Sequence, residues 1–462
     1  MRLRELTLEN FRSFQKLSIS FGQRLTVLIA PNGIGKTSVL DAAAIALGAF
    51  VGGFDDGRSG GFSSTDIRRF RPLGAIGVGM ELAPNGCAVH AKGVVPLSSL
   101  QSRCASYEDE MSWTRRLKSV NSKTTRVEAK HVTAAAEGLQ RCVRTALDEP
   151  VDLPLLAYYG VSRLYQQRSL TTLKLANTSR TAGYTDCLEP SSNYKLVIHW
   201  LGYWFTSRLD AVRREDREEE AAFDKLIASV MRPVSICMAQ TGWTSVDYSV
   251  ANQDLVATHE IRGELPVHLL SDGLRNMLAL VLDMAFRATV LNPHLGASAS
   301  AKTSGVVLID EVGLHLHPGW QQVVVAGFQE AFPQVQFVMT THSPHVLTNV
   351  DRESIRILEA TGDDSSQVIV HIPDYQTDGV ESDEVLNRVM GVSPVPVDNE
   401  HAEQVSRYTM LLAQDQIGTP EEEALLREIV EHYEEESLTV QRLRSARRMH
   451  ERRARLLERR AE

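Results

Sequence analysis

The stretch Ala30-Pro31-Asn32-Gly33-Ile34-Gly35-Lys36-Thr37 decides the fold of this chain. It follows residues 25–29, an apolar, β-branched run that is typical of a buried strand. It precedes residues 36–47, whose pattern predicts a helix ending at Gly48. A strand, a glycine-rich turn and a helix in this order predict a phosphate-binding loop, because backbone N–H groups of the turn and of the helix start can surround a phosphate.

Each polar residue of this loop has a predicted role. The stretch matches G-x-x-x-x-G-K-[ST], except that Ala30 replaces the first glycine, and we expect strain from this change rather than loss of the loop. Lys36 would neutralise the outer phosphates of ATP, and the Thr37 hydroxyl would bind Mg²⁺. The predicted cofactor-binding residues of this loop are Asn32, Gly33, Gly35, Lys36, Thr37 and Ser38.

A second predicted strand, residues 305–309, ends in two adjacent carboxylates, Asp310 and Glu311. Such a pair at the tip of a buried strand is costly unless a cation or hydrogen bonds compensate it. Asp310 fits a Mg²⁺ anchor, and Glu311 fits a residue that orients or deprotonates the attacking water. The alternative is a strand that runs into an ordinary acidic turn.

A third predicted strand, residues 335–341, leads directly into His342. A histidine at the carboxyl end of a strand lies where open α/β sheets bind ligands. We expect His342 to hydrogen-bond the outermost phosphate, and a structural histidine is the alternative. Glu311 and His342 are therefore the predicted catalytic residues.

A fourth segment, Leu270-Ser271-Asp272-Gly273, opens a predicted apolar helix over residues 276–288. Ser271 fits a helix N-cap, which alone would explain it, although a helix start with serine and glycine is also an anion site. The segment resembles the signature Leu-Ser-Gly-Gly-Gln of ABC-type ATPases, with Asp272 and Leu274 at its third and fifth positions. The resemblance implies that Ser271 and Gly273 cover the phosphate held by a second copy, in a head-to-tail dimer enclosing two ATP molecules.

Two blocks indicate the branch of these ATPases. Residues 8–14, Leu-Glu-Asn-Phe-Arg-Ser-Phe, resemble the opening of RecF, OLD and related repair ATPases. That resemblance makes Arg12 a candidate phosphate contact, and a surface arginine on an edge strand is the alternative. Residues 311–318 are similar to the E-x-G-x-H-L-H-P pattern of OLD-like defence ATPases. For His315 and His317 we expect a turn at the dimer seam rather than a metal pair.

Residues 154–163 and 375–392 resemble blocks of the ATPases in Septu anti-phage systems and in retrons that carry the same ATPase. This resemblance implies an ATPase that controls a separate HNH nuclease. In a retron system, the reverse transcriptase and its RNA/DNA would be further partners. The alternative is a RecF-like DNA repair ATPase that binds DNA directly.

The predicted fold is α/β, an ABC-type P-loop ATPase head with a mostly parallel sheet, antiparallel N-terminal strands, an inserted helical lobe and a helical C-terminal region. The expected parts are the head with the phosphate loop (1–95), the inserted lobe (96–260), the second part of the head (261–372) and a partner-binding region (373–462). Residues 50–260 hold no long heptad array, which argues against coiled-coil arms. Neither Asp363-Asp364 nor Asp383-Glu384 forms the metal set of an OLD nuclease, so we expect no built-in nuclease.

The composition, with 43% hydrophobic and 23% charged residues among 462, is typical of a soluble globular protein. No apolar run reaches the roughly 20 residues that span a bilayer, so we expect a cytoplasmic protein without membrane contact. Five cysteines without paired spacing predict free thiols. The net charge of −9 confines any nucleic-acid contact to a local patch. The arginine-rich residues 442–460 could bind phosphates, pair with the acidic residues 421–436, or dock on a partner helix.

Overall fold

The computed structural model describes the whole chain except residues 72–79, 100–104, 146–149, 162–178, 191–193, 240, 362–366, 394–395, 397, 415 and 462. The chain forms two compact units, Met1–Val385 and Leu386–Glu462, and each is described by itself. The end of the Septu-like block, Ser162 and Arg163, and the carboxylates Asp363 and Asp364 lie outside the described residues.

The largest sheet of unit 1 brings three predicted strands next to one another. Its strands, in spatial order, are β15 (Val368–His371), β14 (Ile355–Ala360), β3 (Leu25–Ile29), β13 (Val335–Thr340), β12 (Gly305–Ile309) and β8 (Leu155–Tyr159). All neighbours are parallel except β14 and β15. Because β3, β13 and β12 are adjacent and parallel, the segments that follow them meet at one edge of the sheet.

A second, antiparallel sheet contains the N-terminus. Its strands, in spatial order, are β2 (Phe14–Ser20), β1 (Arg2–Phe11), β6 (Cys87–Ser99) and β7 (Ala105–Leu117). On β1, the apolar residues Leu6 and Leu8 are fully buried while their neighbours are more exposed, as expected for a strand with one face in the core. The pairing of Phe11 with Phe14 makes β1 and β2 a hairpin with Arg12 and Ser13 at its tip.

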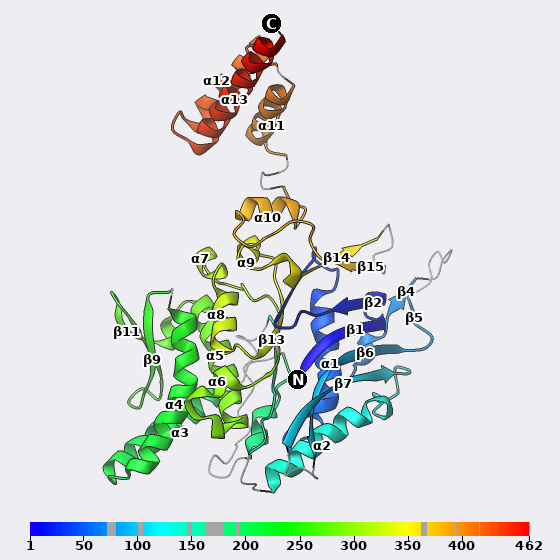
Figure 1. Ribbon diagram of the computed structural model, residues 1–462, viewed down its shortest axis with the longest axis vertical. Helices are drawn as coiled ribbons and strands as arrows, with labels where there is room; N and C mark the ends of the chain where they lie inside the picture. Colours follow the sequence, from blue (N-terminus) through cyan, green and yellow to red (C-terminus); the bar gives the residue numbers. More distant parts are fainter. Residues whose placement is uncertain are drawn as a thin grey trace. The chain divides into compact units, whose positions relative to one another are not determined.

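Helix α1 (Lys36–Val51) lies between these two sheets and contacts both (Figure 1). It is apolar on all sides, as expected for a helix covered on all sides. The prediction that this helix ends at Gly48 is wrong. The helix continues past Gly48 to Val51, and Gly52 is its C-cap. The buried residues Phe50 and Val51 favour this continuation because they pack in the core.

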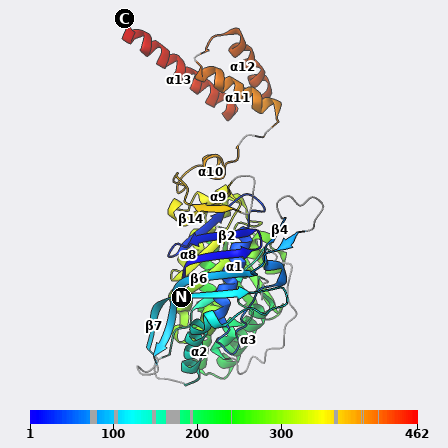
Figure 2. The same ribbon diagram turned by 90° about the vertical axis from the view of Figure 1, so that its right-hand side faces the viewer.

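The remaining helices of unit 1 surround the sheets (Figures 1 and 2). They are α2 (Lys130–Arg144), α3 (Tyr194–Arg213), α4 (Arg217–Met238), α5 (Asp272–Leu291), α6 (Ala299–Lys302), α7 (Pro318–Gln321), α8 (Val324–Ala331), α9 (Pro344–Leu347) and α10 (Ser382–Arg388), which crosses the unit boundary. A small antiparallel sheet follows α4, formed by β9 (Trp243–Ser249), β10 (Asp254–His259) and β11 (Gly263–Pro266). Two short strands, β4 (Arg69–Phe70) and β5 (Glu81–Leu82), pair separately.

The predicted inserted lobe, residues 96–260, is less separate than expected. It contains helices α2, α3 and α4, but also β7 and β8, which belong to the two main sheets. On its inner side, Trp200 and Trp204 pack against Phe286 of α5, with ring centroids 5.6 and 5.9 Å from it. The five-residue apolar run of β8 is too short to be told from a helical segment by pattern alone.

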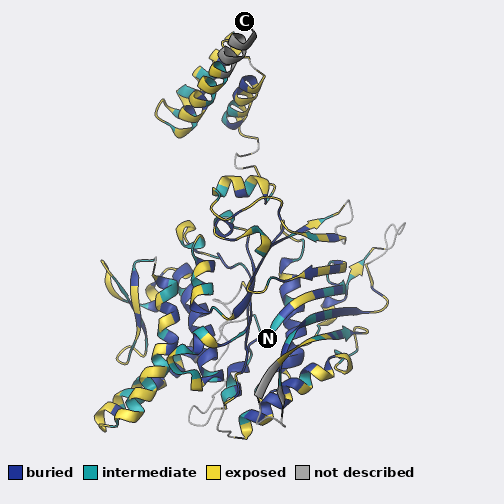
Figure 3. Ribbon diagram, viewed as in Figure 1, coloured by how far each residue is buried: buried dark blue, intermediate teal, exposed yellow. Residues whose placement is uncertain are grey.

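Unit 2 is helical, with α11 (Glu400–Ala413), α12 (Pro420–Tyr433) and α13 (Leu438–Ala461). Its core includes Tyr408, Leu412, Ile429 and Val440, and most of its other positions are exposed (Figure 3). The Tyr408 hydroxyl donates to the fully buried Glu422 carboxylate at 2.6 Å. Arg447 of α13 lies 3.1 Å from the same carboxylate, so part of the arginine-rich tail is paired inside its own unit.

Two further findings concern the cysteines and the question of a membrane-spanning helix. Cys142 is disulfide-bonded, so the expectation that all five cysteines are free thiols is wrong for this residue. Cys87, Cys187 and Cys237 are free, and burial raises the pKa of the Cys87 and Cys187 thiols to about 12. Within the described residues, no helix combines the length and the apolar content that crossing a membrane requires.

A candidate nucleotide-binding site

The turn between β3 and α1 has the geometry of a phosphate-binding loop. Gly33 and Gly35 have positive φ angles of 83° and 113°, which glycine adopts without a steric cost. A Cβ atom on Gly35 would lie 2.5 Å from the Phe14 ring, so the β1–β2 hairpin packs directly against the turn. No side chain caps the start of α1, which leaves the helix start open to an anion. Ala30 has no positive φ, so its backbone carries no left-handed strain.

Lys36 is held beside the predicted catalytic residues. Its ammonium donates to the Ala30 carbonyl at 3.0 Å and lies 2.6 Å from His342 Nε2. The two side chains therefore meet directly at the predicted phosphate position. Burial lowers the pKa of Lys36, and the negative charges of Glu311 and Asp310 oppose that shift. The site therefore holds the partly desolvated Lys36 ammonium where a phosphate is expected to bind.

Thr37 and Asp310 also meet, although 273 positions separate them in the chain. The Thr37 hydroxyl donates to Asp310 Oδ2 at 2.8 Å. The other carboxylate oxygen, Oδ1, accepts from the Thr340 hydroxyl at 2.6 Å. Asp310 is 1% exposed and Thr340 is fully buried, so this carboxylate is fixed in place. A hydroxyl and a carboxylate oxygen side by side are the kind of hard ligands that Mg²⁺ prefers.

Glu311 stands in a strained conformation. Its φ is +50°, in the left-handed region that costs a non-glycine residue about 1–3 kcal/mol. Its backbone N–H donates to the Thr340 hydroxyl at 2.8 Å, which helps to hold this geometry. The carboxylate Oε1 lies 3.4 Å from His342 Nε2. Burial, assisted by the charge of Asp310, raises the pKa of Glu311 despite the opposing effects of His342 and Lys36. A raised pKa suits a general base.

Arg12 lies at the tip of the β1–β2 hairpin and is bound by two carboxylates. It forms ion pairs with Asp41 of α1 and, at 2.9 Å, with Asp66. Asp41 also accepts a 2.7 Å hydrogen bond from the Tyr158 hydroxyl. Burial alone would lower the pKa of Arg12, but the two carboxylates outweigh it and raise that pKa. Arg12 is thus anchored next to the loop by α1, and is not a free surface arginine.

Ser271 and Gly273 are placed away from these groups. Ser271 is the N-cap residue of α5, yet its exposed side chain makes no capping hydrogen bond. Gly273 is buried against the turn after β12. The contact is so close that a Cβ on this residue would lie 2.2 Å from the His315 carbonyl oxygen. Among the described residues, neither hydrogen-bonds the phosphate loop of its own chain.

The turn that follows Glu311 is held by one glutamine. The Gln321 amide donates to the carbonyls of Gly313 and Leu316, and its oxygen accepts from Ser343 at 2.6 Å. His315 has a φ of +62° within this turn. In the part of the chain that the structure describes, no group of three or more His, Cys, Asp or Glu side chains could hold a metal. His317 caps α7 through Gly319 N–H.

The sequence reasoning missed four residues of the site. Thr340 ends the third strand and bridges Asp310 and Glu311, whereas Asp41, Asp66 and Tyr158 organise Arg12. Thr340 directly precedes Thr341 and His342, so its position beside a site residue was a usable signal. Asp66 lies 54 positions from Arg12, and no pattern in the sequence links the two.

The residues present fit Mg²⁺-ATP. The open helix start and the buried Lys36 suit the phosphates, and the Thr37–Asp310 pair suits the cation. The fold and the site together define a P-loop ATPase head of the AAA/ABC class. An AAA-domain family model matches residues 5–230, and a second AAA-domain model matches residues 180–348.

Comparisons with known proteins narrow this class. The Retron Ec83 probable ATPase of Escherichia coli is 22% identical over 96% of this chain and 86% of its own length. The Retron Vc95 probable ATPase of Vibrio cholerae serotype O1 biovar El Tor is 25% identical over 78% and 73%. The Septu protein PtuA of Bacillus thuringiensis is 30% identical over 28% of this chain and 33% of its own. The chain is a distant homologue of the retron ATPases and of PtuA.

A solved SMC head bound to the C-winged helix domain of ScpA aligns with 80% of this chain and 98% of its own. The identity is 16% and the TM-score is 0.47. The assignment of the fold rests on the strand order and on the loop geometry, not on this likeness.

Proposed function

We propose that the protein binds and hydrolyses ATP with Mg²⁺ and acts as the ATPase subunit of an anti-phage defence complex. Lys36 and the backbone of the loop bind the phosphates, and Thr37 with Asp310 holds the cation. Glu311 activates water, and His342 contacts the outermost phosphate. The observation that carries this proposal is the hydrogen-bonded chain from Thr37 through Asp310 and Thr340 to Glu311, because it fixes the cation ligand and the base together.

The proposed active form is a head-to-tail dimer, in which Ser271 and Gly273 of one copy complete the site of the other. Two observations support it. The Ser271 hydroxyl is exposed and does not cap its own helix, so it is available to a ligand. Helix α5 is 20 residues long and no side chain caps its start, so its macrodipole favours an anion there, while Asp272 of its first turn is paired with Arg275. ATP would then stabilise the closed dimer by its higher affinity for that state.

A mixing experiment tests the dimer. Lys36→Ala removes the phosphate cation, and Ser271→Arg blocks the opposite face, so each variant alone should hydrolyse no ATP above background. In an equal mixture, half of the dimers pair the two variants and each keeps one complete site, so about a quarter of wild-type turnover should return. A mixture as inactive as its components would contradict the shared site. Glu311→Gln should trap the dimer in ATP, as measured by light scattering.

The proposed partner is an HNH nuclease, bound through the helical unit 2, in the cytoplasm. The support is the distant homology with retron ATPases and PtuA. In a retron system, a reverse transcriptase and its RNA/DNA would join the complex. The test is co-purification with the HNH protein from the neighbouring gene, in wild type and in a chain truncated after residue 385. Failure of the full chain to bind in any nucleotide state would overturn this part alone.

The second candidate is a RecF-like repair ATPase that contacts DNA directly through the arginines of α13 (Figure 1). The pairing of Arg444 with Glu435 and of Arg447 with Glu422 reduces the charge that the helix offers to phosphates. This observation favours protein docking. ATP-dependent duplex binding that Arg448→Glu abolishes would favour the repair reading instead.

A further inference from the structure

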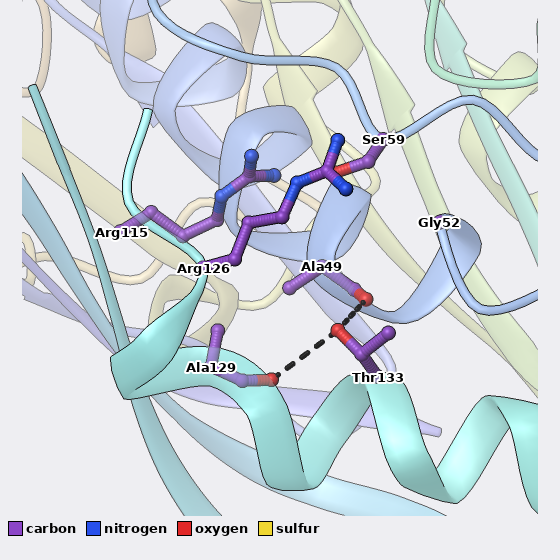
Figure 4. Close-up of a pocket in the computed structure, with 7 residues that line it drawn as sticks. All are labelled: Ala49, Gly52, Ser59, Arg115, Arg126, Ala129 and Thr133. Atoms are coloured by element: carbon purple, nitrogen blue, oxygen red, sulfur yellow. Dashed lines mark hydrogen bonds between the residues drawn. The ribbon is translucent and has the colours of Figure 1, made fainter. Parts of the chain in front are cut away.

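A small pocket lies at the far end of α1 from the nucleotide-binding site. Its lining includes Arg115 of β7, Arg126 before α2, and Ser59 after α1 (Figure 4). Ala49, at the pocket, lies 13 positions after Lys36, which at 1.5 Å per residue is about 20 Å along the helix. The pocket is therefore separate from the phosphate loop.

Arg115 is the unusual residue of this pocket. It is 2% exposed, although a buried guanidinium needs several acceptors to replace its lost water. One described hydrogen bond serves it, from Nη1 to the Ile45 carbonyl at 3.0 Å, out of five N–H donors. The Arg115 side chain also lines the pocket.

No carboxylate balances this charge. Within the described residues, neither Arg115 nor Arg126 forms an ion pair with an aspartate or glutamate, whereas the nearby Arg58 and Arg144 pair with Asp186 and Asp55. Burial, followed by the positive charge of Arg126, lowers the pKa of Arg115 to about 10. Figure 4 shows Arg115, Arg126 and Ser59 among the residues that line the pocket. An anion bound between these two like charges would offset their repulsion.

Another polar group of the pocket wall, the Thr133 hydroxyl, already makes hydrogen bonds within the protein. The Thr133 hydroxyl donates to the carbonyls of Ala49 and Ala129, so it has no further proton to offer (Figure 4). Gly48 approaches closely enough that a Cβ there would lie 3.1 Å from Arg115 Nη1. The cavity volume is about 30 Å³, far below the range of roughly 300–1,000 Å³ typical of sites for drug-sized ligands.

We propose that this pocket binds one phosphate group, clamped by the guanidinium groups of Arg115 and Arg126 and by the Ser59 hydroxyl. A planar guanidinium offers paired N–H donors that match two oxygens of a tetrahedral oxyanion. The small volume admits a single phosphate, either as free orthophosphate or as the terminal phosphate of a nucleic-acid strand. A nucleotide base has no room beside it.

The test measures phosphate binding with the nucleotide-binding site silenced. Full-length Lys36→Ala protein is dialysed to equilibrium against radiolabelled orthophosphate, with sodium chloride holding the ionic strength constant. We expect saturable binding of one phosphate per chain. Arg126→Ala, added to this background, should weaken it at least about tenfold, because a hydrogen bond to a charged group is worth about 1.5–3 kcal/mol. Arg126 is exposed, so this variant should fold normally, as circular dichroism will verify.

Arg58→Ala is the matched control, because Arg58 is an exposed arginine next to Ser59 that does not line the pocket. It should leave phosphate binding unchanged. The proposal is overturned if Lys36→Ala protein binds no phosphate, if Arg126→Ala binds as tightly as its parent, or if Arg58→Ala loses as much as Arg126→Ala. Competition by an oligonucleotide with a 5′-phosphate, but not by its 5′-hydroxyl counterpart, would identify a nucleic-acid end as the source. Competition by neither would identify free phosphate.

Discussion

The replacement Thr340→Val tests whether one hydroxyl positions both carboxylates of the site. Valine has nearly the same shape, so the change removes two hydrogen bonds without leaving a cavity. The bond to the Asp310 carboxylate is worth about 1.5–3 kcal/mol, and the bond from the Glu311 N–H about 0.5–1.5 kcal/mol. We expect the free energy of unfolding to fall by about 2–4 kcal/mol, as measured by urea denaturation.

Turnover should fall by more than stability explains. Thr340 holds Glu311 at a strained φ of +50°, and a shift of about 1 Å in a catalytic group can cost roughly 10² in rate. The assay is steady-state phosphate release at saturating ATP, well below the unfolding temperature of the variant. Thr340→Ser, which keeps the hydroxyl, should retain most of the rate.

The control for buried threonines in general is Thr26→Val. Thr26 is fully buried in β3 and accepts one 2.8 Å hydrogen bond from Gly22 N–H at the opposite end of the strand. The Thr26→Val protein should lose about 0.5–1.5 kcal/mol in its free energy of unfolding and keep the wild-type rate of ATP turnover. The reasoning is refuted if Thr340→Val hydrolyses ATP at the wild-type rate, or if Thr26→Val loses an equal factor.

Three other predictions concern the same head. Burial raises the pKa of Glu311 above the ordinary glutamate value of 4.5, and the carboxylate base is lost as the pH falls through that raised pKa. The pKa that governs the acidic side of the kcat/KM profile should therefore lie above 4.5, and one at or below 4.5 would exclude Glu311 as the base. Ser271→Ala should change the free energy of unfolding by less than about 0.5 kcal/mol while it lowers ATPase activity, because its hydroxyl caps nothing; equal activity would argue against a trans contact. Gly273→Ala should destabilise the fold by about 1–3 kcal/mol in thermal melts, since its Cβ would meet the His315 carbonyl at 2.2 Å, and an unchanged melt would show that the helix start can shift freely.

The sequence was most informative where the chemistry is local. Strands β3 and β12 begin and end at the predicted residues, because short apolar runs bounded by a glycine turn or by carboxylates leave few alternatives. The contact between Thr37 and Asp310 could be predicted, because the phosphate loop and the acidic strand end were both expected to bind the same Mg²⁺ ion. The predicted helix end at Gly48 was wrong because burial on both sides of α1 outweighs the low helix propensity of glycine.

What the sequence did not predict depends on contacts between distant segments. The Arg12 clamp needs Asp41 on α1, Asp66 in a loop and Tyr158 on β8 to converge, and none of these has a spacing that marks it. The place of β8 in the main sheet was not predicted for the same reason, because it is set by pairing with β12. Long-range pairing is decided by the sum of many contacts, so no short window of residues contains it.

The contact between Gly273 and the turn at His315 has a consequence for how two active sites communicate. The turn, residues 312–315, directly follows Glu311, and the start of α5 rests on it without room for a side chain. If Glu311 activates water as proposed, a movement of the turn when its carboxylate changes charge or position would displace the start of α5. In the proposed head-to-tail dimer, that helix start would face the nucleotide of the other copy. The two hydrolysis events would then be coupled through a rigid backbone contact, which predicts alternating rather than independent firing.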